Sequence, residues 1–529
     1  MKKSNKIYTP LLLSIACAAG LMLGARLNFD TGDELFSANP KKQKLNRLID
    51  YIDYEYVDDV NTDSIVDVTV NKILENLDPH SVYIPKDEYA KVSENMKGDF
   101  VGIGVSFYQV NDTIVVIQAL EGGPSAKIGI RGGDRILYAN GKALFKNDVT
   151  EDSVIAQLKG KENSKVSLKV LRKGSDELLT FNVKRGVVPI KSVDASYMLT
   201  KELGYIKIDR FSETTYEEFS EAIQELKASG ATQIALDLRD NPGGYLSEAI
   251  NIADEFIKDD KLILFTKNKS GSIEETFAQR EGEFENGKVF VLINENSASA
   301  SEVVAGALQD NDVGTIVGRR SYGKGLVQRE MELGDGSAVR LTIARYYTPT
   351  GRSIQRPYDS TSRKDYYAEV QNRYDSGEMQ DPSNIPTLDS IEYTTPKGKK
   401  VYGGGGITPD IYISNKESPE ELWSSYLIRS NLVDRFVFLE LDQNIQKYNF
   451  DSAARLFNEE LPFKEDFIKA FKLYCKQNNF PIEVKDDERL LNSIKAYIAV
   501  QLFDENLSTR IINEEDSFIK MALSQIENK

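Results

Sequence analysis

The chain has few of the residues that most often build metal sites and catalytic triads. Its 529 residues include one histidine, His80, and two cysteines, Cys17 and Cys475. So few ligands support neither a zinc cluster nor a disulfide framework. A Ser-His-Asp triad would have to recruit His80, whereas a serine paired with a lysine needs no histidine. We interpret His80 as a structural residue.

The chain also has fewer basic than acidic residues. The chain has 66 lysine and arginine residues against 82 aspartate and glutamate residues, a formal net charge of −16. Binding to nucleic-acid phosphates needs basic patches, so we expect no nucleic-acid partner. The content of 40% hydrophobic and 28% charged residues is that of a globular protein, and the length allows two to four domains.

Only one stretch, at the N-terminus, is long and apolar enough to cross a membrane. Three lysines precede an uncharged run of 19 residues, 7–25, and acidic residues follow it. We expect residues 1–30 to be a signal peptide or, preferably, an uncleaved anchor, because no small-x-small cleavage site closes the run. The charge asymmetry favours an exported protein, tethered on the periplasmic side of the inner membrane by residues 7–25. Lipid attachment at Cys17 fits the surrounding residues poorly.

The stretch 289–328, VFVLINENSASASEVVAGALQDNDVGTIVGRRSYGKGLVQ, is the most informative part of the chain. Its apolar run Phe290 to Ile293 predicts a buried strand, and the residues from Ala300 onward return at helical spacing. Ser299 stands where the helix begins, where unpaired N–H groups favour developing negative charge, so it is a candidate nucleophile. Ser299 and Glu302 also match the Ser-x-x-Glu capping box, which starts many helices that have no catalytic role. Ser297 and Ser301 remain open as alternative nucleophiles.

Lys324 is the candidate base. It lies between two glycines in SYGKGLVQ, so other groups can approach it closely, and if it is desolvated its pKa falls toward neutral. The plain alternative is a solvated loop lysine.

Strand and helix patterns divide the rest of the chain. Residues 44–76 have helical spacing, residues 97–187 have short strands with glycine turns, and residues 190–415 alternate strands with helices. In the last of these, Gly243 and Gly244 form a turn after a strand, whose N–H groups suit an oxyanion hole or simply turn the chain. We expect Pro357 to Lys400 to be a surface excursion. Residues 417–529 return to helical spacing and could brace the core, dimerise or dock a partner.

The segments NENSASASEVVAGALQD and YGKGLVQ resemble the active-site signature of the C-terminal processing peptidases, also called tail-specific proteases. The resemblance implies that Ser299 is the nucleophile, Lys324 the base and Gln328 the residue that positions the lysine. It places the oxyanion against the N–H of Ala300 and that of Gly243 or Gly244, which the sequence does not separate.

The run GPSAKIGIRGGDRIL, 123–137, resembles a bacterial PDZ domain. In such a domain the loop Gly102, Ile103, Gly104 would take a terminal carboxylate, and the peptide would add as a strand along Val105 to Phe107. Without the resemblance, the same glycines are only a turn entering a strand.

The expected fold is α/β, with a core like those of crotonases and Clp proteases, an inserted β-rich PDZ domain, and helical N- and C-terminal regions. The expected boundaries are 38–96 for the N-terminal helices, 97–188 for the PDZ-like domain, 189–415 for the peptidase core and 416–529 for the C-terminal extension.

The expected function is a serine endopeptidase that captures free C-termini of proteins or peptides and cleaves them with a Ser-Lys pair, without metal or cofactor. A homo-oligomer remains open. The alternatives are a non-catalytic PDZ scaffold and a crotonase-like acyl-transfer enzyme.

Overall fold

A computed structural model describes residues 40–529 except 111, 146–148, 176, 359–361, 387–390, 449–451, 460, 462, 481–487 and 528–529. The expected signal or anchor, with residues 7–25 and Cys17, lies outside the described residues. Within the part that is described, no helix is long and apolar enough to cross a membrane. The chain forms two units, Met1–Ile73 and Leu74–Lys529.

The described part of the first unit consists of two helices. These are α2 (Pro40–Glu55) and α3 (Thr62–Leu74), in the region 44–76 where the sequence predicted helical spacing. The Thr62 hydroxyl, at the start of α3, donates a 2.7 Å hydrogen bond to Asp53. This bond joins α2 to the start of α3 across the short connection between them.

A six-stranded sheet forms the centre of the second unit, in the order β10-β11-β12-β15-β16-β21. All neighbours in it are parallel except the antiparallel pair β10 and β11. The strands are β10 (Val193–Met198), β11 (Leu203–Ile208), β12 (Gln233–Asp237), β15 (Lys288–Ile293), β16 (Gly314–Gly318) and β21 (Ile411–Tyr412). Because parallel strands share one carboxyl-end edge, the loops after β12, β15 and β16 meet there.

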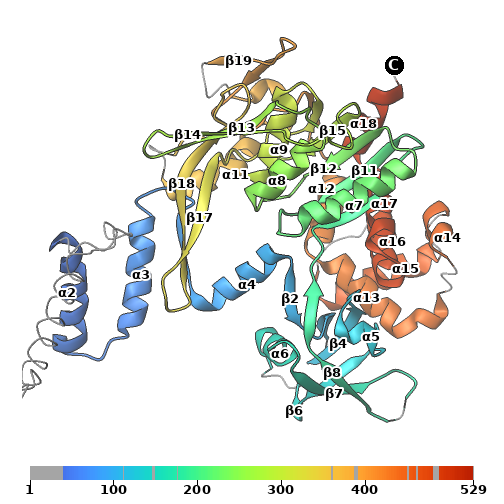
Figure 1. The fold of residues 1–529 in the computed structure, drawn as a ribbon. Helices are drawn as coiled ribbons and strands as arrows, with labels where there is room; N and C mark the ends of the chain where they lie inside the picture. Colours follow the sequence, from blue (N-terminus) through green and yellow to red (C-terminus); the bar gives the residue numbers. More distant parts are fainter. Residues whose placement is uncertain are drawn as a thin grey trace, which may run out of the picture. The chain divides into compact units, whose positions relative to one another are not determined.

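Helices cover both faces of this sheet (Figure 1). The helices α7 (Thr215–Ala228), α8 (Leu246–Asp254) and α9 (Ala300–Asp310) share a core with one set of alternating strand residues, such as Ile206 and Val291. The other set, such as Tyr205 and Leu292, packs against α18 (Ser517–Glu527), which comes from the end of the chain. Alternation of side chains along each strand explains why both faces are apolar.

A second sheet supports the loop that follows β16. Its order is β1-β18-β13-β14, and β17 also pairs with β18. The strands are β1 (Val82–Ile84), β13 (Leu262–Asn268), β14 (Ile273–Phe277), β17 (Leu326–Glu332) and β18 (Ala338–Tyr347). The strand β17 begins two residues after Lys324, so this sheet fixes the far side of the lysine loop.

A small β domain is inserted ahead of the central sheet. The ribbon of β2 (Asp99–Gly102) and β9 (Gly186–Pro189) carries the chain in and out of it. Its sheet runs β3-β4-β5-β7-β8, with β6 paired to β5. The strands are β3 (Val105–Val110), β4 (Thr113–Ala119), β5 (Arg135–Ala139), β6 (Lys142–Ala143), β7 (Lys165–Leu171) and β8 (Leu179–Lys184), and the helices are α5 (Pro124–Lys127) and α6 (Glu151–Leu158). Helix α4 (Lys86–Lys97) precedes the ribbon.

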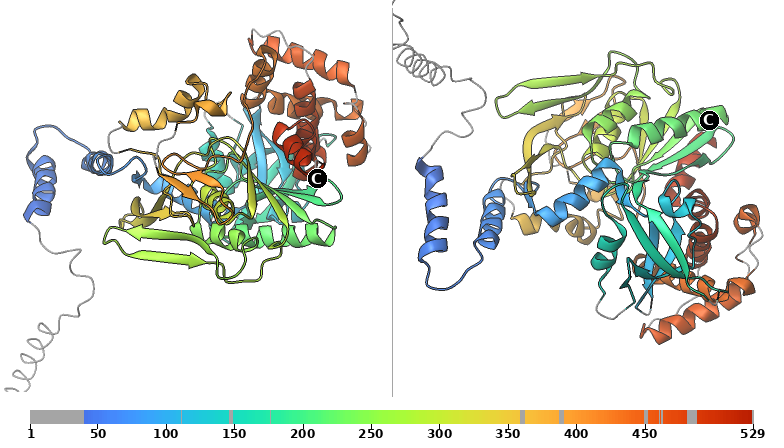
Figure 2. Two further views of the ribbon diagram at one scale, coloured as in Figure 1. Left: turned by 90° about the horizontal axis from the view of Figure 1, so that it is seen from above. Right: turned by 60° about the horizontal axis from the view of Figure 1, so that its bottom comes forward.

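The C-terminal helices have a core of their own and continue beside the small β domain (Figure 2). They are α12 (Pro419–Arg429), α13 (Leu432–Asn444), η3 (Ile445–Lys447), α14 (Ala453–Asn458), α15 (Lys464–Gln477), α16 (Glu488–Leu502) and α17 (Glu505–Asn513). On the side of the small domain, Asp442 pairs with Arg135 at 2.7 Å. On the side of the central sheet, Asp516 pairs with Arg239 at 2.6 Å.

The segment expected to be a surface excursion is partly buried. It contains α10 (Arg363–Tyr367), α11 (Glu369–Asp375), η2 (Pro382–Asn384) and the hairpin of β19 (Glu392–Thr394) and β20 (Lys400–Tyr402). Tyr366, Arg373 and Glu378 are each at most 3% exposed. The polar composition of the segment suggested the surface, but Glu369 and Glu378 pair with arginines from inside and outside the segment: Arg320, Arg356 and Arg373.

Candidate active site

Ser299 lies at the carboxyl end of the central sheet, between β15 and α9. It is half-buried and is the N-cap of α9, with φ 56° and ψ −113°. A non-glycine residue with positive φ is strained, and such strain is characteristic of sharp turns that present a nucleophile. Ser299 and Glu302 form a capping box at the start of α9, in which the Glu302 carboxylate accepts from the Ser299 N–H at 2.8 Å. The capping box and the strained turn are thus both present, and the cap does not exclude Ser299 as the nucleophile.

The two neighbouring serines are used differently. Ser297 and Ser301 are 0% exposed. The Ser297 hydroxyl donates to the carbonyl of Leu238 at 2.8 Å, and the Ser301 hydroxyl donates to that of Asn241 at 3.0 Å. Both hold the serine loop against the loop after β12. Of the three candidates that the sequence left open, Ser299 has the hydroxyl best placed to react.

The glycine turn after β12 lies directly against Ser299. A Cβ on Gly243 would lie 2.8 Å from the Ser299 Cβ and 2.9 Å from the Ala300 nitrogen. On Gly244, which has φ 152°, it would lie 2.0 Å from the carbonyl oxygen of Phe211. Both positions therefore require glycine.

The N–H groups of this turn are not equivalent. Gly243 donates to Oδ1 of Asn241 at 2.8 Å, while its carbonyl accepts from Phe211 at 3.0 Å. Since a trans peptide group is planar, the N–H of Gly244 points away from Phe211. Among the described residues, neither Gly244 nor Ala300 has a hydrogen-bond partner for its N–H.

Lys324 lies in the loop between β16 and β17 and is half-buried. The pKa of Lys324 is lowered from its ordinary value of 10.5 to about 8. Burial is the main cause and the Arg340 guanidinium adds to it, whereas the carboxylates of Glu302 and Asp78 oppose it. About a tenth of the lysine is therefore neutral at pH 7, and this fraction, which can act as a general base, grows as the pH rises.

One carboxylate oxygen brings the two candidate residues together. Oε2 of Glu302 accepts hydrogen bonds from the backbone N–H of Ser299 and from that of Lys324, both at 2.8 Å. The two backbone nitrogens are thus no further apart than twice that distance. Residues that are 25 positions apart in the sequence are neighbours at the backbone.

Gln328 lies on β17, on the lysine side of the site. Its Nε2 donates to the carbonyl of His80 at 2.7 Å. The His80 ring in turn lies 2.8 Å from the Tyr366 hydroxyl. The turn that carries His80 precedes β1. The sequence suggested a structural role for His80 but not that it would lie beside Gln328 and the lysine loop.

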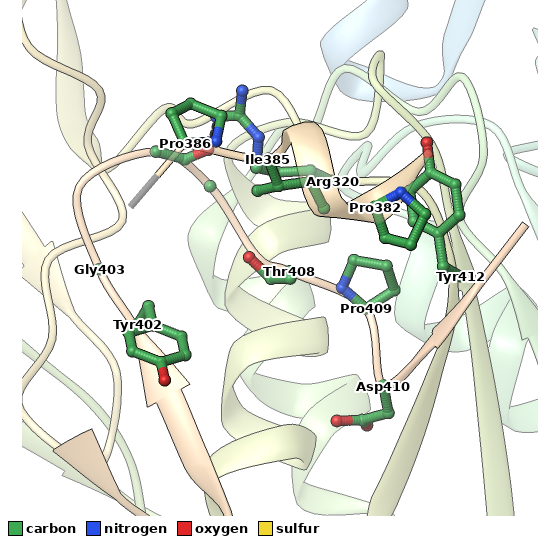
Figure 3. A pocket seen from close by; sticks show the side chains of 12 residues that line it. Arg320, Pro382, Ile385, Pro386, Tyr402, Gly403, Thr408, Pro409, Asp410 and Tyr412 are labelled. Atoms are coloured by element: carbon green, nitrogen blue, oxygen red, sulfur yellow. Dashed lines mark hydrogen bonds between the residues drawn. The ribbon is translucent and has the colours of Figure 1, made fainter. Parts of the chain in front are cut away.

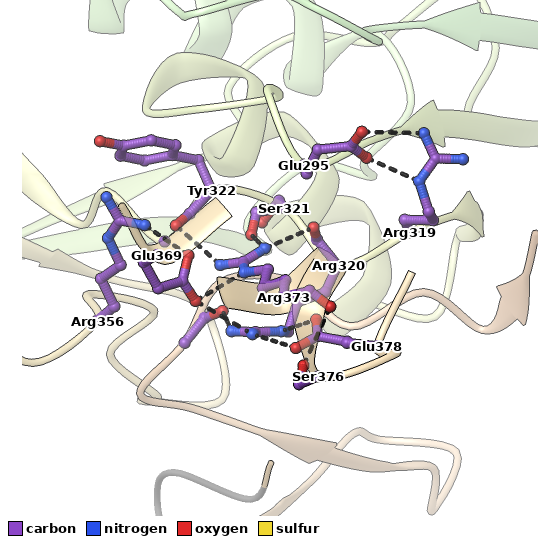
Figure 4. A network of polar contacts seen from close by, with 12 residues as sticks. Glu295, Arg319, Arg320, Ser321, Tyr322, Arg356, Glu369, Arg373, Ser376 and Glu378 are labelled. Carbon is purple, nitrogen blue, oxygen red and sulfur yellow. Dashed lines mark hydrogen bonds and ion pairs between the residues drawn. The ribbon is translucent and has the colours of Figure 1, made fainter. Parts of the chain in front are cut away.

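Sequence reasoning also missed the support beneath this loop. Arg373 donates from Nη1 to the carbonyls of Arg320 and Ser321, at 3.0 and 2.8 Å (Figure 4). Glu369 and Glu378 pair with the surrounding arginines. Only the excess of charged residues in a segment with no clear helical or strand period could have signalled a buried network.

The small β domain has an open groove beside β3, which is an edge strand of its sheet. A pocket of about 380 Å³ there is lined by Ile103, Gly104, Val105 and Phe107, together with residues of α6 and α4. Gly102 pairs with Gly186 in the ribbon at its base. Four of the five residues expected to bind a peptide thus line one pocket, and the fifth adjoins it.

Two other pockets lie elsewhere. One, of about 380 Å³, lies between the segment Gly403 to Tyr412 and η2, which begins at Pro382, with Arg320 at its wall (Figure 3). Another, of about 540 Å³, lies between the small β domain and the C-terminal helices. Neither is lined by Ser299 or Lys324. Across the described ranges, no group of three or more His, Cys, Asp or Glu side chains could hold a metal ion.

Comparison with known families gives three matches along the chain. Residues 202–359 match peptidase family S41, residues 101–184 match the PDZ domain, and residues 423–504 match a family of unknown function. The first two ranges contain the candidate catalytic residues and the groove beside β3.

Comparison with curated proteins gives relatives that extend over most of the chain. The carboxy-terminal processing protease CtpA of Bacillus subtilis is 32% identical over 394 residues, which cover 72% of this chain and 82% of that protein. A carboxy-terminal-processing protease of Bartonella bacilliformis is 33% identical over 349 residues, covering 64% and 79%. Among solved structures, a photosystem II D1 C-terminal processing protease is 25% identical, with a TM-score of 0.36 and coverage of 70% and 86%.

Proposed function

The chain belongs to peptidase family S41, the carboxy-terminal processing proteases, and we propose that Ser299 and Lys324 are its catalytic pair. It is a serine protease with a mixed α/β fold that carries a PDZ domain. The single observation that supports the pair most directly is the shared Glu302 oxygen, which places the backbones of Ser299 and Lys324 side by side. Family membership disfavours the two alternatives, a non-catalytic scaffold and an acyl-transfer enzyme.

The chemistry proceeds by nucleophilic attack with proton transfer through the lysine. Neutral Lys324 takes the hydroxyl proton of Ser299 as Oγ forms a bond to the peptide carbonyl carbon. The tetrahedral intermediate collapses, the C–N bond breaks, and the lysine ammonium gives its proton to the leaving amine. Water then attacks the ester, again with Lys324 as the base, and the proton returns to Ser299.

The oxyanion is stabilised by backbone N–H groups. Ala300 is at the first position of α9, and Gly244 is the glycine of the turn whose N–H is not already bonded. Gly243 contributes by its close approach to Ser299, since its own N–H is taken by Asn241. Loss of one such donor typically costs about 10²- to 10³-fold in kcat.

The PDZ domain captures the substrate's C-terminus. The peptide would add as a strand to the free edge of β3, along Val105 to Phe107, while the loop Gly102, Ile103, Gly104 receives the carboxylate. The apolar wall formed by Ile155 and Leu158 of α6 suits an apolar side chain near the end of the peptide. Substrates are thus proteins or peptides with free C-termini.

The proposal also covers the domain boundaries, the layering of the core, the C-terminal region and the location of the protein. We place the domain boundaries at 38–96, 97–188, 189–415 and 416–529, with a core layered as in crotonases and Clp proteases. The parallel sheet with helices on both faces supports that layering. Residues 416–529 brace the other parts, because they contact both the PDZ domain and the central sheet. Export, a tether at residues 7–25 and self-association stay proposals based on the sequence.

Peptide cleavage by the exported fragment, residues 31–529, tests the proposed function. Two peptides of one sequence, with a free and with an amidated C-terminus, are compared for wild type, Ser299→Ala and Lys324→Ala. We expect wild type to cleave the free peptide faster, and both variants to lose at least about 10³-fold in kcat. Full activity of Ser299→Ala would overturn the catalytic assignment, and equal rates on both peptides would overturn capture of the carboxylate.

A further inference from the structure

Two side chains outside the catalytic pair connect the backbones of Ser299 and Lys324. Glu302 accepts from the N–H groups of both residues through Oε2. The hydroxyl of Tyr346 lies 2.7 Å from the carbonyl oxygen of Lys324 and 3.1 Å from that of Ser299. The N–H groups of the two residues are thus bridged by a carboxylate, and their carbonyls by a phenol.

The carboxylate of Glu302 also holds the loop leading to Lys324. Its Oε1 accepts from the Ser321 hydroxyl at 2.5 Å and from the N–H of Gly323 at 2.7 Å. Together with the bonds to Oε2, four donors surround one fully buried carboxylate, which is 0% exposed. An ionised carboxylate accepts at both oxygens, and such charge-assisted bonds are stronger than neutral ones.

A simple helix cap needs much less than this. The helix-capping function of Glu302 requires only its bond to the Ser299 N–H. The other three donors lie 19 to 22 residues further along the chain and contribute nothing to starting α9. Burying a carboxylate away from water is costly unless it is fully hydrogen-bonded, so the additional bonds point to a role in joining the two segments.

Tyr346 comes from a third segment, the end of β18. Its side chain is 2% exposed and belongs to the core shared by α7, α8 and α9. The neighbouring Tyr347 points to the other face of the strand and stacks on Phe265, with ring centroids 4.9 Å apart. Tyr347 is thus a neighbouring tyrosine on the same strand that is less buried and whose ring faces away from the two catalytic residues.

We propose that Glu302 and Tyr346 are positioning residues that set the separation of the nucleophile Ser299 from the base Lys324. The inference rests on the proposed function, since it concerns the same catalytic pair. Neither side chain need touch the substrate. Each acts by fixing the backbone from which a reacting side chain extends, and a misplacement of about 1 Å at a reacting centre can cost about 10²-fold.

Glu302 has a second effect that Tyr346 lacks, because its carboxyl group can carry charge. Burial raises the pKa of this carboxyl, and its four hydrogen bonds oppose that rise. The charged groups around Lys324 are Glu302 on α9, Arg340 on β18 and Asp78 in the turn before β1. Of these, Glu302 and Asp78 raise the pKa of Lys324 and Arg340 lowers it. A neutral residue at position 302 would therefore move the titration of Lys324 to lower pH, whereas loss of the Tyr346 hydroxyl would leave it in place.

The experiment compares kcat as a function of pH for wild type, Glu302→Gln, Tyr346→Phe and the matched control Tyr347→Phe, with thermal unfolding of each. We expect kcat on the pH plateau to fall by about 10²-fold in Glu302→Gln and about tenfold in Tyr346→Phe. The acid limb should move to lower pH only in Glu302→Gln. The control should match wild type.

Several outcomes would overturn the proposal. These are kcat within twofold of wild type in both Glu302→Gln and Tyr346→Phe, an unmoved acid limb in a folded Glu302→Gln, or an equal loss in Tyr347→Phe. If Glu302→Gln does not fold, the comparison of kcat between Tyr346→Phe and Tyr347→Phe tests the proposal by itself. Ser299→Ala is measured in parallel: if it still cleaves, the catalytic assignment fails, whereas if it is inactive and the other variants behave as wild type, only the positioning role fails.

Discussion

Gln328 and His80, 248 positions apart in the sequence, are joined by a 2.7 Å hydrogen bond from the glutamine Nε2 to the histidine carbonyl. The bond uses the backbone of His80 and leaves its ring against Tyr366. Burial, with the nearby Lys324 charge as the next cause, lowers the pKa of His80 to about 3. The chain's one histidine is thus held neutral beside the lysine loop.

The pH dependence of catalysis should therefore report Lys324 and not His80. The base acts when it is neutral, so kcat/KM should rise with pH through about 8, the pKa of Lys324. No limb should appear near 6.5, the ordinary pKa of histidine. A profile from pH 5.5 to 10 for wild type and His80→Asn checks this. A limb near 6.5 that disappears in His80→Asn would contradict the account.

The serines on either side of Ser299 should affect stability without being needed for chemistry. Ser301→Ala removes one buried hydrogen bond to the loop after β12, which costs about 1 kcal/mol. Ser297→Ala removes the equivalent bond and also the acceptor of the Asn294 N–H, so it should cost about 2 kcal/mol. We expect each variant to keep kcat within about tenfold of wild type. Denaturant unfolding and peptide cleavage measure the two effects separately. If either substitution inactivates the enzyme as completely as Ser299→Ala does, that serine would again be a candidate nucleophile.

Arg373 should be important for the lysine loop although it is far from the substrate. Arg373→Met leaves the carbonyls of Arg320 and Ser321 without their donor and leaves Glu369 with fewer partners. Breaking a buried ion pair by removing one partner destabilises by about 3 to 5 kcal/mol. We expect a loss of stability and a loss of kcat at temperatures where the protein is folded.

The exposed Arg429 provides the control for this prediction. Arg429→Met should leave both the unfolding midpoint and kcat unchanged. Equal behaviour of the two methionine variants would show that the segment containing α10 and α11 does not support the catalytic loop.

The last helix should be part of the protease core and not a dispensable tail. Phe518 is 6% exposed, and its ring centroid lies 4.5 Å from Cζ of Arg239 and 5.4 Å from Cζ of Arg319. Arg239 precedes the glycine turn, and Arg319 precedes the lysine loop. Phe518→Ala should destabilise the protein by about 3 to 5 kcal/mol. In the control, Ile512→Ala, the side chain removed is 51% exposed, and the change should stay within about 0.5 kcal/mol. Denaturant unfolding that gives equal midpoints for both would contradict this packing.

Local patterns were enough to predict much of the fold. The apolar run ending at Ile293 is β15, and the helical spacing from Ala300 is α9. The alternation of strands and helices predicted for residues 190–415 is present, with β11, β12, β16 and β18 among the strands. These signals are contained within ten or so residues, so one sequence suffices to read them.

The contacts that complete the site could not be predicted in this way. Glu302 was visible as a cap for Ser299, but its bond to Lys324 depends on how the loop after β16 returns to α9. Arg373 lies in a polar segment with weak periodicity, and only tertiary pairing with Glu369 makes it a buried residue. Helical spacing likewise indicated α18 but not that it covers one face of the central sheet.

The central claim is tested most directly by trapping the covalent intermediate. Wild-type enzyme is mixed with a peptide substrate, quenched in acid within one turnover, digested and mapped by mass spectrometry. We predict an acyl group on Ser299, absent in Ser299→Ala and strongly reduced in Lys324→Ala. An acyl group on Ser297, Ser301 or any other residue, or none at all in enzyme that turns over, would contradict the account.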